Sequence, residues 1–169
     1  MADNVFHVVP FRDSLAHRFK ELNIAWLCKY FEVESIDEEM LSDPQRFIID
    51  KGGHILFAEM NGAVVGTCAL MKSGVDQLEL GKMAVAEEYQ GQGIGRALLK
   101  SAIEQAQKAG AKELLLYSNS ILKPAIHLYE SFGFTSVPLK RSDYKRSNIK
   151  MIKQLALSSV EDRRRIDSI

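Results

Sequence analysis

The chain has no excess charge of either sign, because 22 lysine and arginine residues balance 22 aspartate and glutamate residues. Proteins that bind nucleic acid or anionic membranes through their overall charge are strongly basic, so we expect neither partner. No run of about 18 apolar residues occurs, and no basic segment followed by an apolar one opens the chain. We therefore expect a cytoplasmic protein without a membrane span.

Cysteine is also scarce. The two cysteines, Cys28 and Cys68, have neither the spacing of a metal site nor the density of a disulfide scaffold. Each lies in an apolar stretch, so we expect buried or half-buried free thiols in a reducing compartment. We expect no bound metal.

The length and composition indicate one folded domain. With 169 residues, 46% hydrophobic and 26% charged, the chain can bury a full core. Repeats, low-complexity segments and an interdomain linker are absent from the sequence. We expect a domain over 1–157 and a charged, frayed tail over 158–169.

The N-terminal half shows helical segments and a hairpin. The apolar spacing over 11–31 predicts one broken helix or two short ones. The acidic start of 35–50 favours a helix N-terminus, and Asp43-Pro44 indicates a break before a further helical turn. Asn61-Gly62 separates two apolar runs, which is a strong hairpin signal. The strands expected in this half are 5–10, 54–60 and 63–72.

The C-terminal half indicates a strand, helix, strand unit followed by a short helix and two strands. Strict alternation over 75–85 would place Glu79, Gly81, Met83 and Val85 on one face and Leu78 and Leu80 on the other. The continuous apolar run of 112–118 is typical of a strand buried on both faces, in a parallel pair. The remaining elements are expected at 93–109, with Gly110 as its C-terminal cap, at 124–133, at 134–137 and at 148–155.

Three glycines at alternate positions, Gly91, Gly93 and Gly95, lie where a strand gives way to a helix. Glycine costs about 1 kcal/mol against alanine in a helix, so the pattern needs a reason. Unpaired N–H groups at a helix N-terminus attract anions, and glycines let a diphosphate approach them. The pattern is neither a P-loop nor a dinucleotide fingerprint, since Arg96 stands where the latter needs its third glycine.

The segment "QGQGIG" at 90–95 resembles the acyl-coenzyme A signature Q/R-x-x-G-x-G/A of the GNAT superfamily of N-acetyltransferases. The segment "AIHLYESFGF" at 125–134 is similar to that superfamily's A-x-x-L-Y-x-x-x-G-F segment. Two departures stand out: Glu87 replaces a frequent proline, and Leu122 replaces a frequent asparagine, whose amide Asn119 is expected to supply. The resemblance implies an α/β (α+β mixed) single domain with a mostly antiparallel sheet, splayed between its fourth and fifth strands and flanked by helices.

The resemblance implies a site for acetyl-coenzyme A as cosubstrate. Backbone groups of one strand would pair with the pantetheine arm, and N–H groups of the glycine-rich turn would hold the diphosphate. The alternative is a glycine-rich turn with no ligand. The expected cofactor-binding residues are Met83, Ala84, Val85, Gln90, Gly91, Gln92, Gly93, Ile94, Gly95, Arg96 and Asn119.

Two residues match catalytic positions of the resembled family. Glu79 would accept a proton from the amine, and the alternatives are a surface or ion-paired glutamate with ordered water as the base. Tyr129 would donate a proton to the leaving thiolate, and the alternative is a tyrosine packed in the core. Trp26, Tyr30 and Phe31 would wall the acceptor site or belong to the core. Tyr144 and Arg146 would contact an acceptor carboxylate.

We therefore expect an enzyme that transfers acetyl from acetyl-coenzyme A to a primary amine of a small molecule or peptide, by direct attack in a ternary complex. No cysteine lies in either motif, which disfavours a covalent acyl-enzyme. One alternative is an acyl-coenzyme A sensor or partner-binding module without activity. Another is a nucleotide-binding protein. The sequence leaves open whether the protein forms a homodimer.

Overall fold

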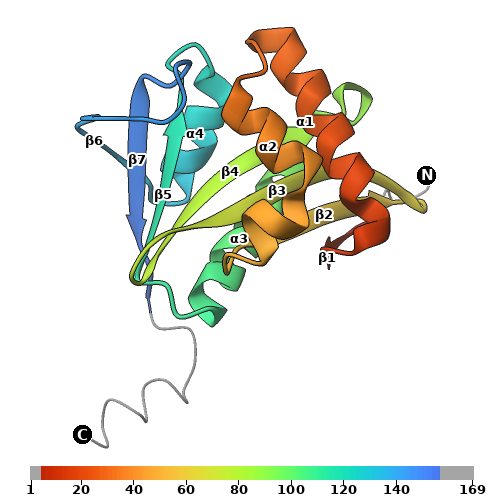
Figure 1. The fold of residues 1–169 in the computed structure, drawn as a ribbon, viewed down its shortest axis with the longest axis horizontal. Helices are drawn as coiled ribbons and strands as arrows, with labels where there is room; N and C mark the ends of the chain where they lie inside the picture. The colour runs from red at the N-terminus through yellow and green to blue at the C-terminus, as the bar shows by residue number, and fades with distance from the viewer. Residues whose placement is uncertain (1–4, 157–169) are drawn as a thin grey trace, which may run out of the picture.

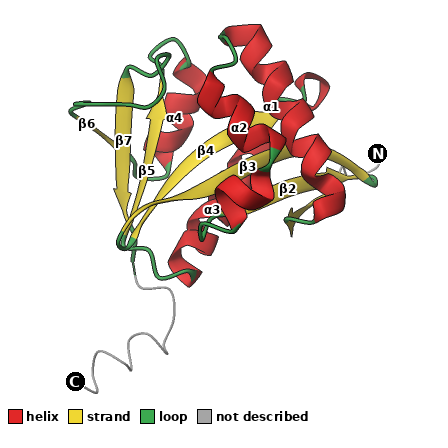
Figure 2. Cartoon of the chain, viewed as in Figure 1, coloured by secondary structure: helices red, strands yellow, loops and turns green. Residues whose placement is uncertain are grey.

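The structure, a computed structural model, describes residues 5–156. Within this range, strands in the order β1-β2-β3-β4-β5-β7-β6 form one sheet with helices on both faces (Figure 1; Figure 2). Only β4 and β5 pair in parallel. The strands are β1 (Phe6–Pro10), β2 (His54–Met60), β3 (Ala63–Gly74), β4 (Gln77–Val85), β5 (Glu113–Ser118), β6 (Thr135–Val137) and β7 (Ile149–Gln154). The mixed, mostly antiparallel sheet expected from the sequence is confirmed.

The helices follow the expected segments closely. After a 3-10 turn at Asp13–Leu15, the first segment forms one continuous helix rather than two. A π-helical turn at Gln45–Ile49 follows the break at Asp43-Pro44. The helices are α1 (Ala16–Tyr30), α2 (Ser35–Ser42), α3 (Ile94–Lys108) and α4 (Lys123–Ser131). The charged tail expected at 158–169 lies outside the described residues.

Each face of the sheet has its own apolar core. On one face, α3 buries Ile94, Leu98 and Leu99 against Leu78 and Leu80 of β4. On the other face, the buried residues include Phe19, Leu22 and Leu27 of α1, Phe57 of β2 and Ala84 of β4. Burying one such leucine or phenylalanine fully stabilises the fold by about 1.5–3 kcal/mol. Both faces of the central strands are therefore covered.

The sheet opens between β4 and β5. Their parallel pairing joins Gln77–Leu80 to Glu113–Leu116 and extends no further. Beyond Leu80 the two strands separate (Figure 1). The expected splay between the fourth and fifth strands is thus present, and it leaves one edge of β4 without a strand partner.

A β-bulge at Lys82 reverses the alternation of side chains along β4. Ala69 faces Gly81 and Thr67 faces Ala84, so β4 carries one extra residue, and Lys82 is left-handed with φ +51°. Glu79 and Gly81 therefore face α1 and α2, whereas Met83 and Val85 pack with the core that contains α3. The expectation that Glu79 shares a face with Met83 and Val85 is wrong, because strict alternation assumes an unbroken strand.

The two cysteines behave differently. Cys68 is buried as expected, and burial raises the pKa of its thiol to about 12. Cys28 is exposed, which corrects the expectation of a buried or half-buried thiol. It follows buried Leu27 on α1, and the next helix position turns about 100° away from the core.

Candidate functional site

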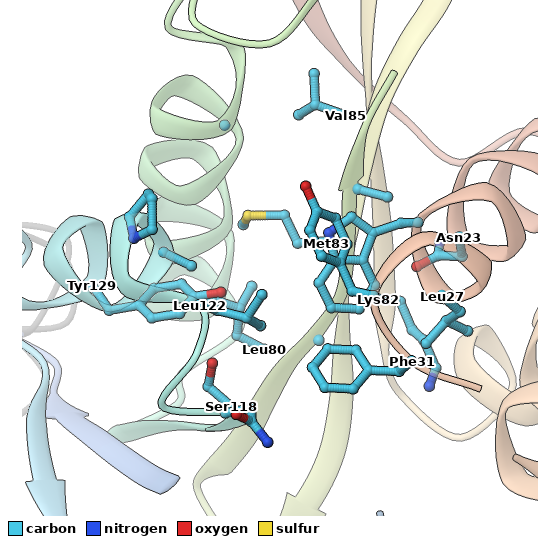
Figure 3. Close-up of a pocket in the computed structure, with 18 of the residues that line it drawn as sticks. Asn23, Leu27, Phe31, Leu80, Lys82, Met83, Val85, Ser118, Leu122 and Tyr129 are labelled. Atoms are coloured by element: carbon cyan, nitrogen blue, oxygen red, sulfur yellow. The ribbon is translucent and has the colours of Figure 1, made fainter. Parts of the chain in front are cut away.

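A cavity of about 580 Å³ occupies the opening between β4 and β5. Its size is that of a ligand site, since such sites span about 300–1,000 Å³. Its walls come from the C-terminal end of α1, the second half of β4, the glycine-rich turn, the end of β5, α4 and the loop before β7. Figure 3 shows β4 between α1, which carries Asn23 and Leu27, and α4, which carries Tyr129. The cavity therefore reaches both faces of the sheet.

The glycine-rich turn presents backbone N–H groups that have no acceptor. Gly93 is the N-cap of α3, and no side chain caps this helix. The N–H groups of Gly91, Gln92 and Gly93 have no hydrogen-bond acceptor among residues 5–156. The first turn of α3 adds the unpaired N–H groups that every helix N-terminus has. The turn is therefore able to hold an anion.

The glycines leave open space above this turn. Gly91 and Gly93 have φ of +78° and +82°, a conformation that favours glycine. Gly95 has no positive φ, and a Cβ there would meet nothing within 4 Å. Packing within the protein therefore does not explain Gly95, whereas a ligand lying close to the backbone would. This observation favours the ligand-binding interpretation over a merely structural turn.

Two polar side chains border the turn. Gln90 Nε2 donates a hydrogen bond to the carbonyl oxygen of Val85 at 3.1 Å, which ties the turn to the end of β4. Arg96 is exposed, and its guanidinium lies 4.8 Å from the centre of the Phe132 ring. Gln90 thus positions the turn, and Arg96 leaves a positive charge beside it.

The free edge of β4 is a second binding element. Met83, Ala84 and Val85 line the cavity, and β5 pairs with none of them. Their backbone groups that point away from β3 can hydrogen-bond an extended ligand, as strand addition does at other sheet edges. The glycine-rich turn follows after a short 3-10 turn at Glu87–Tyr89 and lines the same cavity, so one extended molecule with an anionic end would meet both.

Asn119 lies at the cavity, but both ends of its amide have partners. Nδ2 donates to the carbonyl oxygen of Arg146 at 2.7 Å, and Oδ1 accepts from the N–H of Ile121 at 3.0 Å. The side chain therefore joins the loop after β5 to the loop before β7. Its expected contact with pantetheine stays a prediction.

Tyr129 directs its hydroxyl from α4 into the cavity (Figure 3). Its ring packs edge-on against Phe134 at 5.9 Å, and its hydroxyl makes no hydrogen bond within the described part of the chain. Burial, with a smaller effect of Cys68, raises the pKa of Tyr129 to about 12. A core tyrosine usually has a hydrogen-bond partner, so an unpartnered hydroxyl facing a cavity favours a proton donor.

Glu79 lines the cavity from the α1 and α2 side of β4. Burial raises the pKa of its carboxyl to about 7, while Lys82 acts to lower it and Asp143 to raise it. A carboxyl that titrates near neutrality suits proton abstraction at the pH of a cell. The exposed, ion-paired alternative does not fit, since Glu79 is mostly buried and forms no ion pair within residues 5–156.

The aromatic residues at the end of α1 reach the cavity wall. The Trp26 ring lies 5.5 Å from that of Tyr30 and 5.6 Å from that of Phe31. Tyr30 is 39% exposed, so it does not belong to the core. Trp26 and Phe31 are half-buried and line the same cavity. The structure therefore brings all three together at one wall.

A buried ionic cluster, which the sequence did not suggest, lies next to the cavity, and two of its members line it. We call it the Asp37 clasp: Asp37, Lys82, Arg146 and Glu34. Lys82 Nζ lies 2.5 Å from Asp37 Oδ1, and Arg146 binds both oxygens of Asp37 at 2.7 and 2.9 Å. Arg146 also binds Glu34 Oε2 at 2.9 Å. Burial acts to raise the pKa of Asp37, but these hydrogen bonds outweigh it and hold the pKa below its usual value.

Tyr144 and Arg146 are occupied by this cluster. The Tyr144 ring centre lies 4.5 Å from Lys82 Nζ and 4.7 Å from Arg146 Cζ. Their expected contact with an acceptor carboxylate stays untested, but the guanidinium already binds two carboxylates. Two signals in the sequence that the expectations above did not use could have indicated the cluster: a lysine within the apolar strand β4, and the acidic pair Glu34 and Asp37, which forms a capping box at the start of α2.

Comparison with known proteins agrees with this geometry. The profile of the acetyltransferase (GNAT) family matches residues 20–134. N-acetyltransferase 8 of Rattus norvegicus is 27% identical over 135 residues, which cover 77% of this chain and 57% of that protein. The [ribosomal protein bS18]-alanine N-acetyltransferase of Escherichia coli K12 is 38% identical over 76 residues, 45% of this chain and 51% of that protein. The chain thus spans little more than half the length of these curated relatives.

Solved structures share the fold. A GNAT-family acetyltransferase from Staphylococcus aureus Mu50 superposes with a TM-score of 0.80 at 19% identity, over 90% of this chain and all of that one. The yncA protein of Salmonella typhimurium, solved with its cofactor acetyl-CoA, gives 0.71 at 20% identity, over 90% and 95% of the chains. With the family profile matching more than half of its residues, the chain belongs to the GNAT acetyltransferase family.

Proposed function

We propose that this protein transfers an acetyl group from acetyl-coenzyme A to a primary amine. One observation carries the proposal: a glycine-rich turn with unpaired N–H groups and an unpaired edge of β4 line a single cavity. Coenzyme A combines an anionic diphosphate with an extended, amide-containing arm. The glycine-rich turn matches the diphosphate, and the free edge of β4 matches the extended arm.

The residues of the turn and the strand would bind the cosubstrate. The N–H groups from Gln92 to Arg96 would hold the diphosphate, with Arg96 adding a positive charge. Backbone groups from Met83 to Val85 would hold the pantetheine arm. When bound, acetyl-coenzyme A supplies the acetyl group as a thioester.

Glu79 and Tyr129 are suited to the two proton transfers. Glu79, ionised above its pKa of about 7, would take the proton that the attacking amine must lose. Tyr129 keeps its proton until about pH 12 and would donate it to the leaving sulfur. Of the cysteines, Cys68 faces Leu98 of α3 and Cys28 is exposed, and neither lines the cavity. We therefore favour direct attack of the amine over an acyl-enzyme.

Both curated relatives described above are named as N-acetyltransferases, but only one of the two names states an acceptor. One is named for an alanine of a ribosomal protein, so a peptide amine is one acceptor class to test. None of the helices within residues 5–156 has the length and apolar character that crossing a membrane requires. The cytoplasmic location and the choice between small-molecule and peptide acceptor stay predictions, and the sequence leaves open a homodimer.

The binding test compares two glycines of the same helix. Gly93→Asp places a carboxylate where the diphosphate would lie, and we expect the affinity for coenzyme A, measured by calorimetry, to fall about tenfold or more. Gly110→Asp is the matched control, because Gly110 has φ +81°, equally open surroundings and a position at the far end of α3. Equal affinities for the two folded variants would rule out the proposed diphosphate site.

The activity test separates an enzyme from its alternatives. Release of free thiol from acetyl-coenzyme A should accelerate with amine concentration. Binding of coenzyme A without any amine-dependent release would indicate a sensor or partner-binding module. Tighter binding of ATP or NAD than of coenzyme A, seen as a larger thermal shift at equal concentration, would indicate a nucleotide-binding protein.

A further inference from the structure

The part of the cavity on the α1 and α2 side of the sheet has its own charge pattern. We call it the acceptor end, and its residues are Trp26, Tyr30, Phe31, Glu79, Tyr117 and Tyr144. Tyr129 and Met83 belong to the opposite face, with the core that contains α3. The acceptor end is therefore the region that an amine would occupy while it approaches the thioester.

Among the residues that line the acceptor end and those of the clasp, carboxylates outnumber cations. Lys82 and Arg146 are the two cations among its lining residues, and Asp37 and Glu34 of the clasp balance them. Glu79 lines the cavity and has no ion pair within residues 5–156. The loop before β7 adds the exposed Asp143, which acts on Glu79, and the exposed cations Arg141 and Lys145, and none of these three lines the cavity. A cationic amine would thus enter a region with a surplus of negative charge.

Both cations are balanced within the clasp, because their hydrogen bonds and their charge go to Asp37, Glu34 and Tyr144. Arg146 uses Nη1 for Glu34 and Asp37 and Nη2 for Asp37, and Lys82 Nζ binds Asp37 and Tyr144. Asp37 is fully buried, so a substrate carboxylate that took its place would have to displace a desolvated, multiply bonded carboxylate. Displacement of this kind is strongly unfavourable.

Other cations lie elsewhere. Arg96 is at the glycine-rich turn, at the other end of the cavity. Lys29 pairs with Glu87 at 2.6 Å, and Lys150 lies 5.9 Å from the centre of the Tyr117 ring without lining the cavity. Within the cavity, a carboxylate next to the reacting amine would therefore meet Glu79 rather than a cation without an ionic partner.

We infer that the acceptor is a primary amine on an apolar or aromatic body, with a neutral group rather than a carboxylate beside the amine. The inference rests on the proposed function and narrows its substrate. The aromatic wall would hold the apolar body, and Glu79 would draw the ammonium. Tyr144 and Arg146, expected from the sequence to bind an acceptor carboxylate, serve instead to keep the clasp closed. Free α-amino acids are poor acceptors for such a site.

The test uses amines that differ only in the group beside the nitrogen. Phenylalanine, phenylalaninamide and phenethylamine are compared by kcat/KM in a thiol-release assay on the full chain. We expect both carboxylate-free amines to exceed phenylalanine by about tenfold or more. Phenethylamine controls for basicity, because its amine is at least as basic as that of phenylalanine. A short peptide amide beginning with phenylalanine distinguishes the sources: if it exceeds phenylalaninamide, the acceptor is a peptide, and if it does not, a small amine.

A charge reversal outside the catalytic residues tests the cause. Asp143→Lys places a cation near the acceptor end, and we expect the preference for phenylalaninamide over phenylalanine to fall severalfold while turnover of the amide stays close to wild type. Asp13→Lys, the same change at an exposed site before α1, should leave the preference unchanged. Equal falls in both variants would overturn the electrostatic explanation.

The inference about the acceptor and the proposed acetyltransferase function are refuted by different results. If phenylalanine is acetylated as efficiently as its amide and as phenethylamine, the inference is wrong while the proposed function stands. If none of the amines accelerates thiol release by a protein that binds coenzyme A, the proposed function is wrong, and the inference falls with it.

Discussion

Replacing Glu79 by glutamine gives a sharp test of the chemistry at the acceptor end. The amide is almost the same size as the carboxyl and keeps its hydrogen bonding, but it accepts no proton. Burial raises the pKa of Glu79 from 4.5 to about 7, so the wild-type base is half ionised near neutral pH. Glu79→Gln therefore removes the titration of the Glu79 carboxyl and changes little else.

The expected kinetic effect depends on pH in a specific way. For an amine with a pKa of about 10, wild-type kcat/KM should rise about tenfold per pH unit below 7 and level off between about 7 and 10. Glu79→Gln must instead use amine that is already neutral in solution, so its kcat/KM should still rise about 100-fold between pH 7 and 9. We expect a loss of roughly 10²-fold near pH 7 that shrinks as pH increases.

The same substitution, which should lower activity, should raise the free energy of unfolding relative to wild type as pH increases. A buried carboxyl with a raised pKa favours the folded state fully below pH 4.5, and this contribution is lost as pH rises to about 7. The difference between 4.5 and about 7, at 1.36 kcal/mol per pH unit, is about 3 kcal/mol. The variant avoids this loss, so relative to wild type it should gain up to about 3 kcal/mol between pH 5 and pH 8.

Two measurements on the purified proteins check these expectations. Urea unfolding at pH 5 and pH 8 gives the change in stability, and kcat/KM from pH 6 to 9.5 gives the profile. A constant ratio of wild-type to variant activity at every pH would refute the base role. A stability difference that does not change with pH would refute the raised pKa.

Two further substitutions address the other groups of the site. Tyr129→Phe should lower turnover roughly 10²-fold or more and leave the affinity for acetyl-coenzyme A nearly unchanged, since the hydroxyl acts only on the leaving thiolate. Wild-type turnover in this variant would show that Tyr129 only packs against its neighbours. Asp37→Asn should destabilise the fold by about 3–5 kcal/mol in urea unfolding, because Lys82 and Arg146 lose their buried partner. Glu38→Gln, at an exposed neighbouring position, should have little effect, and similar losses in both would contradict a buried clasp.

The sequence by itself determined most elements and the coenzyme A motif. Asn61-Gly62 forms the expected hairpin, and the three-and-four spacing of α3 appears with its apolar face buried. Such patterns are local: a turn or an amphipathic helix depends on residues close together in the chain. Gly93 at a helix N-cap and Tyr129 at the cavity follow from motifs of the same kind.

Only the tertiary structure decided which groups at the acceptor end are free. The bulge at Lys82 turns Glu79 away from Met83, and no residue pattern in β4 marks the extra residue. Its place in the loop before β7 led to the expectation that Arg146 contacts an acceptor carboxylate. In the structure Asp37, more than a hundred positions earlier, binds both of its terminal nitrogens. Ion pairs between distant segments depend on how α2, β4 and the loop before β7 pack together, and local spacing carries no information about that packing. The charge of the site, and with it the choice of acceptor, is therefore a property of the folded chain.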